Sequence, residues 1–146
     1  HSIEQPIAPN QAEIMQEICA KSRIPIALDE ELIGIDVFQN AFKLLKLVQP
    51  KFLILKPTLL GGLKNCNQWI QLAQNLNISW WATSALESNV GLNAIAQWCA
   101  TKNNAMPQGL GTGALYTNNI PSPLVAEKGK LQYALEKKWN FPIIES

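Results

Sequence analysis

Short apolar stretches recur along the chain at a nearly constant spacing, and amphipathic segments separate them. The stretches begin at Ile24, Lys51, Ile78 and Met106, which lie 27, 27 and 28 positions apart. They are continuously apolar rather than alternating, as is typical of strands that are covered on both faces. The pattern therefore predicts parallel strands that alternate with helices and are joined by right-handed crossovers.

Each intervening segment carries apolar residues three or four positions apart, which is the spacing of one helical face. The predicted faces are Ile14, Ile18 and Cys19; Phe38, Phe42 and Leu45; Cys66, Trp69, Ile70 and Ala73; and Leu92, Ile95, Ala96 and Cys99. Asn10 and Ser88 are predicted to cap the first and the last of these helices.

Two α/β architectures have this repeat: an open doubly wound sheet and half of a (β/α)8 barrel. The stretch QGLGTG, from Gln108 to Gly113, lacks the spacing of a phosphate-binding fingerprint and is interpreted first as a turn. The barrel is therefore favoured, with residues 1–113 forming a partial barrel from the end of strand 4 to strand 8. A whole barrel takes roughly 250 residues. Because the chain begins at His1 without a methionine, we expect it to be a piece of a longer protein.

The composition narrows the class of protein. With 47% hydrophobic residues, 16% charged residues and a net charge of +1, the chain can bury a core. No basic block extends beyond Lys137 and Lys138, so nucleic acid and anionic membranes are not expected partners. No apolar run approaches the roughly 18 residues of a membrane span. The three cysteines have no metal-ligand spacing and indicate reduced thiols in the cytoplasm.

Charged residues end three successive strands. Glu4 follows Ile3, Asp29 follows IPIAL, and Lys56 follows FLIL. The carboxyl ends of barrel strands carry the chemistry of that fold, and neighbouring strands lie about 4.8 Å apart. Two carboxylates there predict a Mg²⁺ site, and an adjacent amine could exchange a proton with carbon. Taken singly, each residue is more simply interpreted as an exit into solvent, but three successive strands that end in charged residues favour a shared site.

The stretches SIEQPI, IALDEEL, LILKPTLLGG and TSALESNVGLNAIAQW resemble, in this order, the C-terminal barrel region of the enolase superfamily. Within it the chain is most similar to the o-succinylbenzoate synthases. The resemblance implies a modified (β/α)7β barrel with three magnesium carboxylates on consecutive strands and two lysines on opposite sides of the site. It also implies that residues 114–146 pack on the barrel and on a separate capping domain, and we expect a hairpin in this segment at Lys128 and Gly129.

The same resemblance assigns roles to individual residues. Glu4 corresponds to the second magnesium ligand, Asp29 to the third, and Lys56 to the catalytic lysine opposite the base. Glu30 corresponds to a second acidic residue of the family.

Three further residues correspond to positions that bind the substrate. Ser84 lies where the family lines its pocket, and Gly109 and Gly111 lie in the segment whose backbone N–H groups can hold a substrate carboxylate. The role of Glu87, which also recurs in the family, stays open.

The family pattern implies a Mg²⁺-dependent lyase in menaquinone biosynthesis, acting on a small-molecule carboxylate by syn elimination of water through an enediolate. The first metal aspartate, the lysine pair that supplies the base and the capping domain do not occur in this chain, so we expect the chain alone to be inactive. An N-acylamino acid racemase or dipeptide epimerase is the alternative enzyme. A non-catalytic half-barrel that forms homo-oligomers or exchanges strands through its unpaired edges is the alternative of another class.

Overall fold

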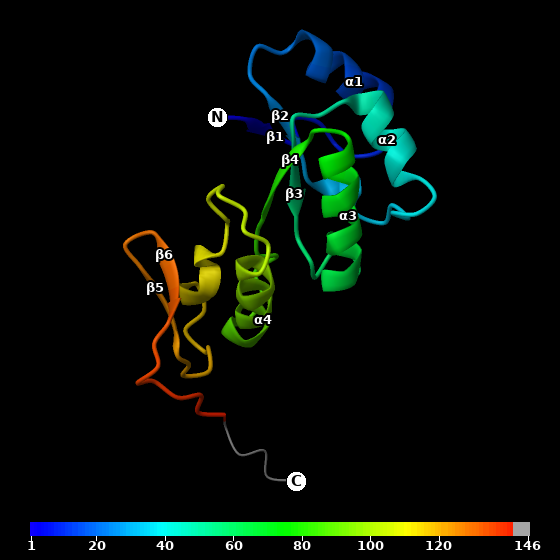
Figure 1. Ribbon diagram of the computed structural model, residues 1–146. Coiled ribbons are helices and arrows are strands. Elements are labelled where there is room, and N and C mark those ends of the chain that lie inside the picture. Colours follow the sequence, from blue (N-terminus) through cyan, green and yellow to red (C-terminus); the bar gives the residue numbers. More distant parts are fainter. Residues whose placement is uncertain (142–146) are drawn as a thin grey trace. The chain divides into compact units, whose positions relative to one another are not determined.

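Four parallel strands form one sheet in which the spatial order of the strands is their order in the chain. They are β1 (Ile3–Glu4), β2 (Ile26–Leu28), β3 (Phe52–Leu55) and β4 (Ser79–Ala82). The structure, a computed structural model, describes residues 1–141 and has two compact units, one up to Thr83 and one from Ser84 onward (Figure 1). The sheet lies in the first unit. The predicted alternation of parallel strands and helices is confirmed.

Helices alternate with these strands. The first unit contains α1 (Ala12–Lys21), the short 3-10 helix η1 (Glu30–Leu32), α2 (Ala41–Val48) and α3 (Leu63–Asn75). Figure 1 shows α2 and α3 along the same side of the sheet. Every residue of β2 and β3 is buried, as expected of strands covered on both faces. The predicted face of α3 is confirmed, since all four of its residues are buried: Cys66, Trp69, Ile70 and Ala73.

The predicted face of α2 is wrong at two positions. Phe38 is 77% exposed and Phe42 is 51% exposed. The helix begins only at Ala41, because the Asp36 carboxylate accepts the N–H of Phe38 at 2.8 Å and holds that segment in a turn. The buried face consists of Ala41, Leu45 and Val48.

The two predicted helix caps differ in outcome. Ser88 occupies the N-cap position of α4 (Asn89–Ala100), although its side chain makes no capping hydrogen bond. The prediction for α1 is wrong, because Gln11 is the N-cap. Asn10 has a φ of 66°, which places it in a left-handed turn before the helix.

The second unit contains α4, the 3-10 helix η2 (Gly111–Ala114) and an antiparallel hairpin of β5 (Leu124–Glu127) and β6 (Lys130–Tyr133). The hairpin turns at Lys128 and Gly129, as predicted. The strand predicted at Met106 is wrong, since only Gly109 forms a one-residue bridge there. Pro107 has no N–H for a ladder, and the Asn104 side chain accepts the N–H of Met106 at 3.0 Å.

The boundary between the two units, after Thr83, lies elsewhere than the predicted division into 1–113 and 114–146. The predicted division separates the partial barrel from its C-terminal segment, whereas the observed boundary separates two compact units. The predicted division therefore stays a prediction. Its last residues, 142–146, lie outside the described residues.

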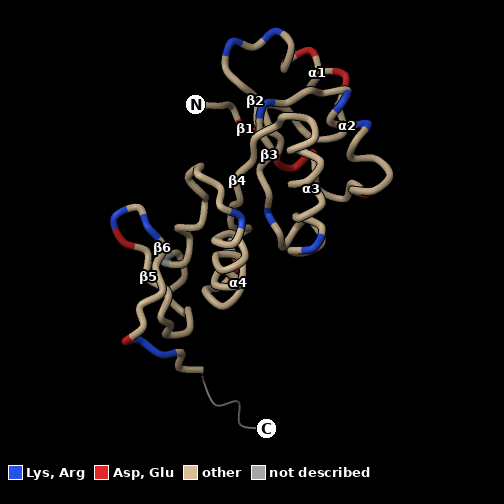
Figure 2. Tube along the Cα trace, in the orientation of Figure 1, with Lys and Arg blue, Asp and Glu red and all other residues tan. Residues whose placement is uncertain are grey.

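The basic residues and the cysteines are distributed as the composition indicates. Lys and Arg are dispersed over both units rather than gathered into one stretch (Figure 2). Among residues 1–141, no helix has the length and apolar character needed to cross a membrane. The three cysteines are free, and burial raises the pKa of the Cys66 thiol to about 12. That thiol is therefore protonated and unreactive at neutral pH.

Candidate functional site

The side chain of Lys56 returns across the sheet to Asp29. β3 is fully buried, and Lys56 is the first residue after it. The Lys56 ammonium group donates a hydrogen bond to the Asp29 carboxylate, whose side chain is 2% exposed. Glu30 adds a second carboxylate oxygen at 3.9 Å from the Lys56 Nζ atom. The lysine at the end of β3 is thus a placed charge and not an exit into solvent.

The strand register puts three charged residues on one face of the sheet. Glu4 lies opposite Ala27, and Ala27 lies opposite Phe52. Asp29 comes two residues after Ala27, and Lys56 comes four residues after Phe52. Because side chains alternate between the faces of a sheet, these even offsets favour the same face for Glu4, Asp29 and Lys56. The contacts among the three residues agree with this register.

The carboxyl group of Glu4 lies close enough to Asp29 for the two groups to interact. Glu4 is exposed as a residue, yet the pKa of its carboxyl group is raised from the ordinary value of 4.5. Partial desolvation is the largest cause, followed by a hydrogen bond with Asp29 and repulsion from the charge of Asp29, while the Lys56 charge lowers the pKa. The structure therefore brings all three residues together at the carboxyl edge of the sheet.

The oxygen atoms of Glu4 and Asp29 are the kind of ligand that Mg²⁺ prefers. Partial desolvation is the main cause of the raised pKa of Glu4, and repulsion from the neighbouring Asp29 carboxylate adds to it. The pair thus fits a divalent cation in chemical kind. Within the described part of the chain, no three His, Cys, Asp or Glu side chains gather closely enough to hold a metal ion. A third ligand from outside this chain stays a prediction.

Two residues beside these carboxylates were missed by sequence reasoning. Gln5 follows Glu4, and its side-chain oxygen accepts the backbone N–H of Asp29 at 3.1 Å. Glu31 is only 5% exposed, and its carboxylate accepts from the Gln5 amide at 3.2 Å. The signal available in the sequence was a polar residue directly after Glu4, in EQP, and a second glutamate two positions after Asp29, in DEE.

In the second unit, Ser84 belongs to a tightly hydrogen-bonded loop. Its hydroxyl group donates to the Glu87 carboxylate at 2.8 Å and accepts the N–H of Leu86 at 2.8 Å. The Glu87 carboxylate also accepts the N–H of Ala85, with both oxygen atoms at 3.0 Å. Ser84 is 5% exposed, so its hydroxyl group serves the loop conformation. Contact of Ser84 with a substrate stays a prediction.

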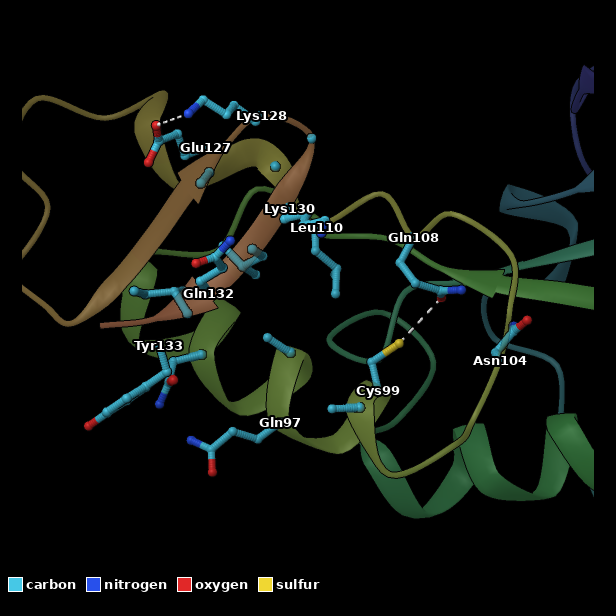
Figure 3. A pocket seen from close by; sticks show the side chains of 18 of the residues that line it. Gln97, Cys99, Asn104, Gln108, Leu110, Glu127, Lys128, Lys130, Gln132 and Tyr133 are labelled. Atoms are coloured by element: carbon cyan, nitrogen blue, oxygen red, sulfur yellow. Dashed lines mark hydrogen bonds and ion pairs between the residues drawn. The ribbon is translucent and has the colours of Figure 1, made fainter. Parts of the chain in front are cut away.

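The two predicted glycines lie beside this loop and beside a cavity of the same unit. The Gly109 carbonyl oxygen accepts the N–H of Ser84 at 3.0 Å. Gly111 begins η2 and lines a cavity of about 790 Å³ between α4 and the hairpin (Figure 3). The Sγ atom of Cys99 donates to the Gln108 side chain at 3.3 Å at one side of this cavity. Binding of a substrate carboxylate by Gly109 and Gly111 stays a prediction.

Comparisons with known proteins agree with the fold and with the quoted motifs. Residues 1–136 match the family model of enolase C-terminal domain-like proteins. An o-succinylbenzoate synthase from Desulfotalea psychrophila is 55% identical over 131 residues, which cover 90% of this chain and 35% of that protein. The chain thus spans about a third of the length of this curated relative.

Solved structures give the same result. The crystal structure of MenC from Desulfotalea psychrophila has a TM-score of 0.86 at 55% identity, with coverage of 90% of this chain and 36% of that chain. A muconate cycloisomerase from Pseudomonas fluorescens has a TM-score of 0.80 at 26% identity, with coverage of 94% and 39%. With a family model that matches nearly its whole length and a parallel strand and helix arrangement shared with these structures, the chain belongs to the enolase C-terminal domain-like family.

Proposed function

We propose that this chain is the C-terminal barrel portion of an o-succinylbenzoate synthase. The observation that carries the proposal is the 55% identity over 131 residues to a protein of that name. The convergence of Glu4, Asp29 and Lys56 at one edge of the sheet supports it, because these residue types suit an elimination next to a carboxylate.

The proposed reaction removes water from 2-succinyl-6-hydroxy-2,4-cyclohexadiene-1-carboxylate, in menaquinone biosynthesis in the cytoplasm. A base outside this chain takes the proton next to the carboxylate, the bond between the ring carbon and the hydroxyl group breaks, and the hydroxide leaves as water after protonation. The ring becomes aromatic. A bound Mg²⁺ would stabilise the negative charge that develops on the substrate carboxylate.

The residues of this chain would have two different roles in this reaction. Glu4 and Asp29 would hold the metal ion with their carboxylate oxygens. Lys56 would present a positive charge to the developing negative charge of the substrate, and its ion pair with Asp29 keeps the ammonium group at this edge of the sheet. The chain alone is proposed to be inactive, since it supplies two metal carboxylates and no second-strand base.

A chimeric enzyme tests the proposal. The matching third of the Desulfotalea psychrophila protein is replaced by this chain, and the product is assayed for o-succinylbenzoate formation and for racemisation of N-succinylamino acids. We expect dehydration to form o-succinylbenzoate. Racemisation without dehydration would contradict the proposal and favour the racemase alternative.

A further inference from the structure

The side-chain amide of Gln5 joins the end of β1 to the end of β2. Its oxygen atom accepts the backbone N–H of Asp29 at 3.1 Å and that of Glu31 at 3.3 Å. Its nitrogen atom donates to the carbonyl oxygen of Ile7 at 3.0 Å and to the Glu31 carboxylate at 3.2 Å. One side chain thereby fixes the backbone immediately after Glu4 and the backbone of Asp29.

Glu31 completes this connection from η1, the short helix that follows β2. Its carboxylate accepts the N–H of Asn10 at 3.0 Å as well as the amide of Gln5, and both donors are neutral. Among residues 1–141, Glu31 has no ion-pair partner. A carboxylate that is only 5% exposed costs solvation free energy unless hydrogen bonds compensate it. The two neutral donors are therefore what maintain Glu31 in this place.

The backbone at Gln5 is itself unusual. Its φ angle is 32°, in a region that residues other than glycine rarely occupy. The N–H of Gln5 donates to the Ala27 carbonyl oxygen at 2.9 Å, so β2 holds this conformation in place. Backbone outliers of this kind persist where tertiary contacts enforce them, and they cluster at functional sites.

We propose that Gln5 and Glu31 are positioning residues that hold Glu4 and Asp29 in the arrangement in which they bind a divalent cation. The inference rests on the metal site of the proposed function. Gln5 acts on Asp29 through the Asp29 backbone N–H and on Glu4 through the turn that follows it. Mg²⁺ requires near-ideal geometry, so a small displacement of either ligand weakens binding.

Substitutions in the chimeric enzyme test this role by Mg²⁺ titration calorimetry. Gln5→Met preserves the size of the side chain and removes its hydrogen bonds. We expect Mg²⁺ affinity to fall by about 10-fold or more, as is typical when the outer partners of metal ligands are lost. Ile70→Val, a change in the core on α3, is the matched control for loss of packing and leaves the affinity unchanged.

Exchanging the amide of Gln5 with the carboxylate of Glu31 distinguishes a positioning role from an effect on general stability. In the double variant Gln5→Glu with Glu31→Gln, the carboxylate at position 5 still accepts both backbone N–H groups and now accepts from the amide at position 31, but it no longer donates to the Ile7 carbonyl oxygen. We therefore expect this variant to recover part of the affinity that each single change loses. It also keeps the test decisive if Gln5→Met does not fold.

The outcomes that contradict the inference are distinct. If Gln5→Met lowers the melting temperature but binds Mg²⁺ as tightly as the unmodified enzyme, the positioning role is overturned and the proposed function stands. If the unmodified enzyme forms no o-succinylbenzoate and binds no Mg²⁺, the proposed function is overturned.

Discussion

Asp29 and Lys56 form an ion pair in which the carboxylate is 2% exposed and the amine is 18% exposed. Both groups have left most of their water, so each depends on the other for compensation. The pair joins the ends of β2 and β3, two neighbouring strands of the sheet. The pair therefore holds the Lys56 ammonium group at the proposed site. It also makes the stability of the fold depend on both charges being present.

Removal of one partner of this pair should be more costly than removal of both. We expect Lys56→Met to lower the free energy of unfolding of this chain by about 3 kcal/mol, because Asp29 is then buried without its cation. The double variant Lys56→Met with Asp29→Asn should lose less than the single change. Urea unfolding at pH 7 measures both, with Lys51→Met, at an exposed position just before β3, as the control. Additive losses in the double variant would show that the two groups are not coupled.

The raised pKa of Glu4 predicts a particular dependence of stability on pH. A carboxyl group whose pKa is higher in the folded state binds more protons there, so its contribution to stability is fully present below the ordinary value of 4.5. The contribution is lost as the pH rises through the raised pKa. The folded state therefore carries a penalty from ionised Glu4 at neutral pH.

Glu4→Gln removes this penalty. We expect the variant to be more stable than the unmodified chain at pH 7, and the gain to shrink toward pH 4. Urea unfolding at the two pH values measures the difference, and Glu13→Gln on the exposed face of α1 is the control. A gain in stability that grows as the pH falls would contradict this prediction.

Much of the fold could be predicted from the sequence because buried parallel strands appear as continuous apolar runs. β2, β3 and β4 all lie within predicted runs, and α3 buries the face that its periodicity indicates. The failures have local causes. Phe38 belongs to a turn and not to a helix, and the run at Met106 contains a proline, which has no N–H for a ladder, and glycines, which weaken a strand.

The site was predictable only in part. Glu4, Asp29 and Lys56 were visible because charged residues after apolar runs are unusual. Which of the two glutamates after Asp29 is buried was not visible, since the short helix η1 decides it and turns Glu31 inward. The connection between Gln5 and Glu31 depends on contacts between residues 26 positions apart, which a single sequence does not reveal.

The loop after β4 should depend on Glu87. Glu87→Ala removes the acceptor for Ser84 and Ala85, with a local loss on the order of 1–2 kcal/mol. We expect the amide hydrogens of Ala85 and Leu86 to exchange with solvent on the order of 10-fold faster. Hydrogen exchange by NMR measures this, and Glu127→Ala at the hairpin is the control. Unchanged exchange at both amides would show that Glu87 does not order the loop.

The β1 edge of the four-stranded sheet should make the isolated chain associate. β1 lies at one end of the strand order and both of its residues are exposed, and an exposed strand edge is a template for pairing with another chain. We expect dimers or higher assemblies in light scattering, with a size that depends on concentration. A monodisperse monomer over the same concentration range would contradict this expectation.

The most direct test of the proposed site compares two lysines at opposite ends of β3 in the chimeric enzyme. Lys56→Ala removes the charge that pairs with Asp29, and Lys51→Ala removes an exposed charge before the strand. We predict that Lys56→Ala lowers kcat for o-succinylbenzoate formation by roughly 100-fold or more, as expected for a group that stabilises developing charge, while Lys51→Ala leaves it within a factor of about 2. Equal rates for the two variants would contradict the assignment of Lys56 to the catalytic site.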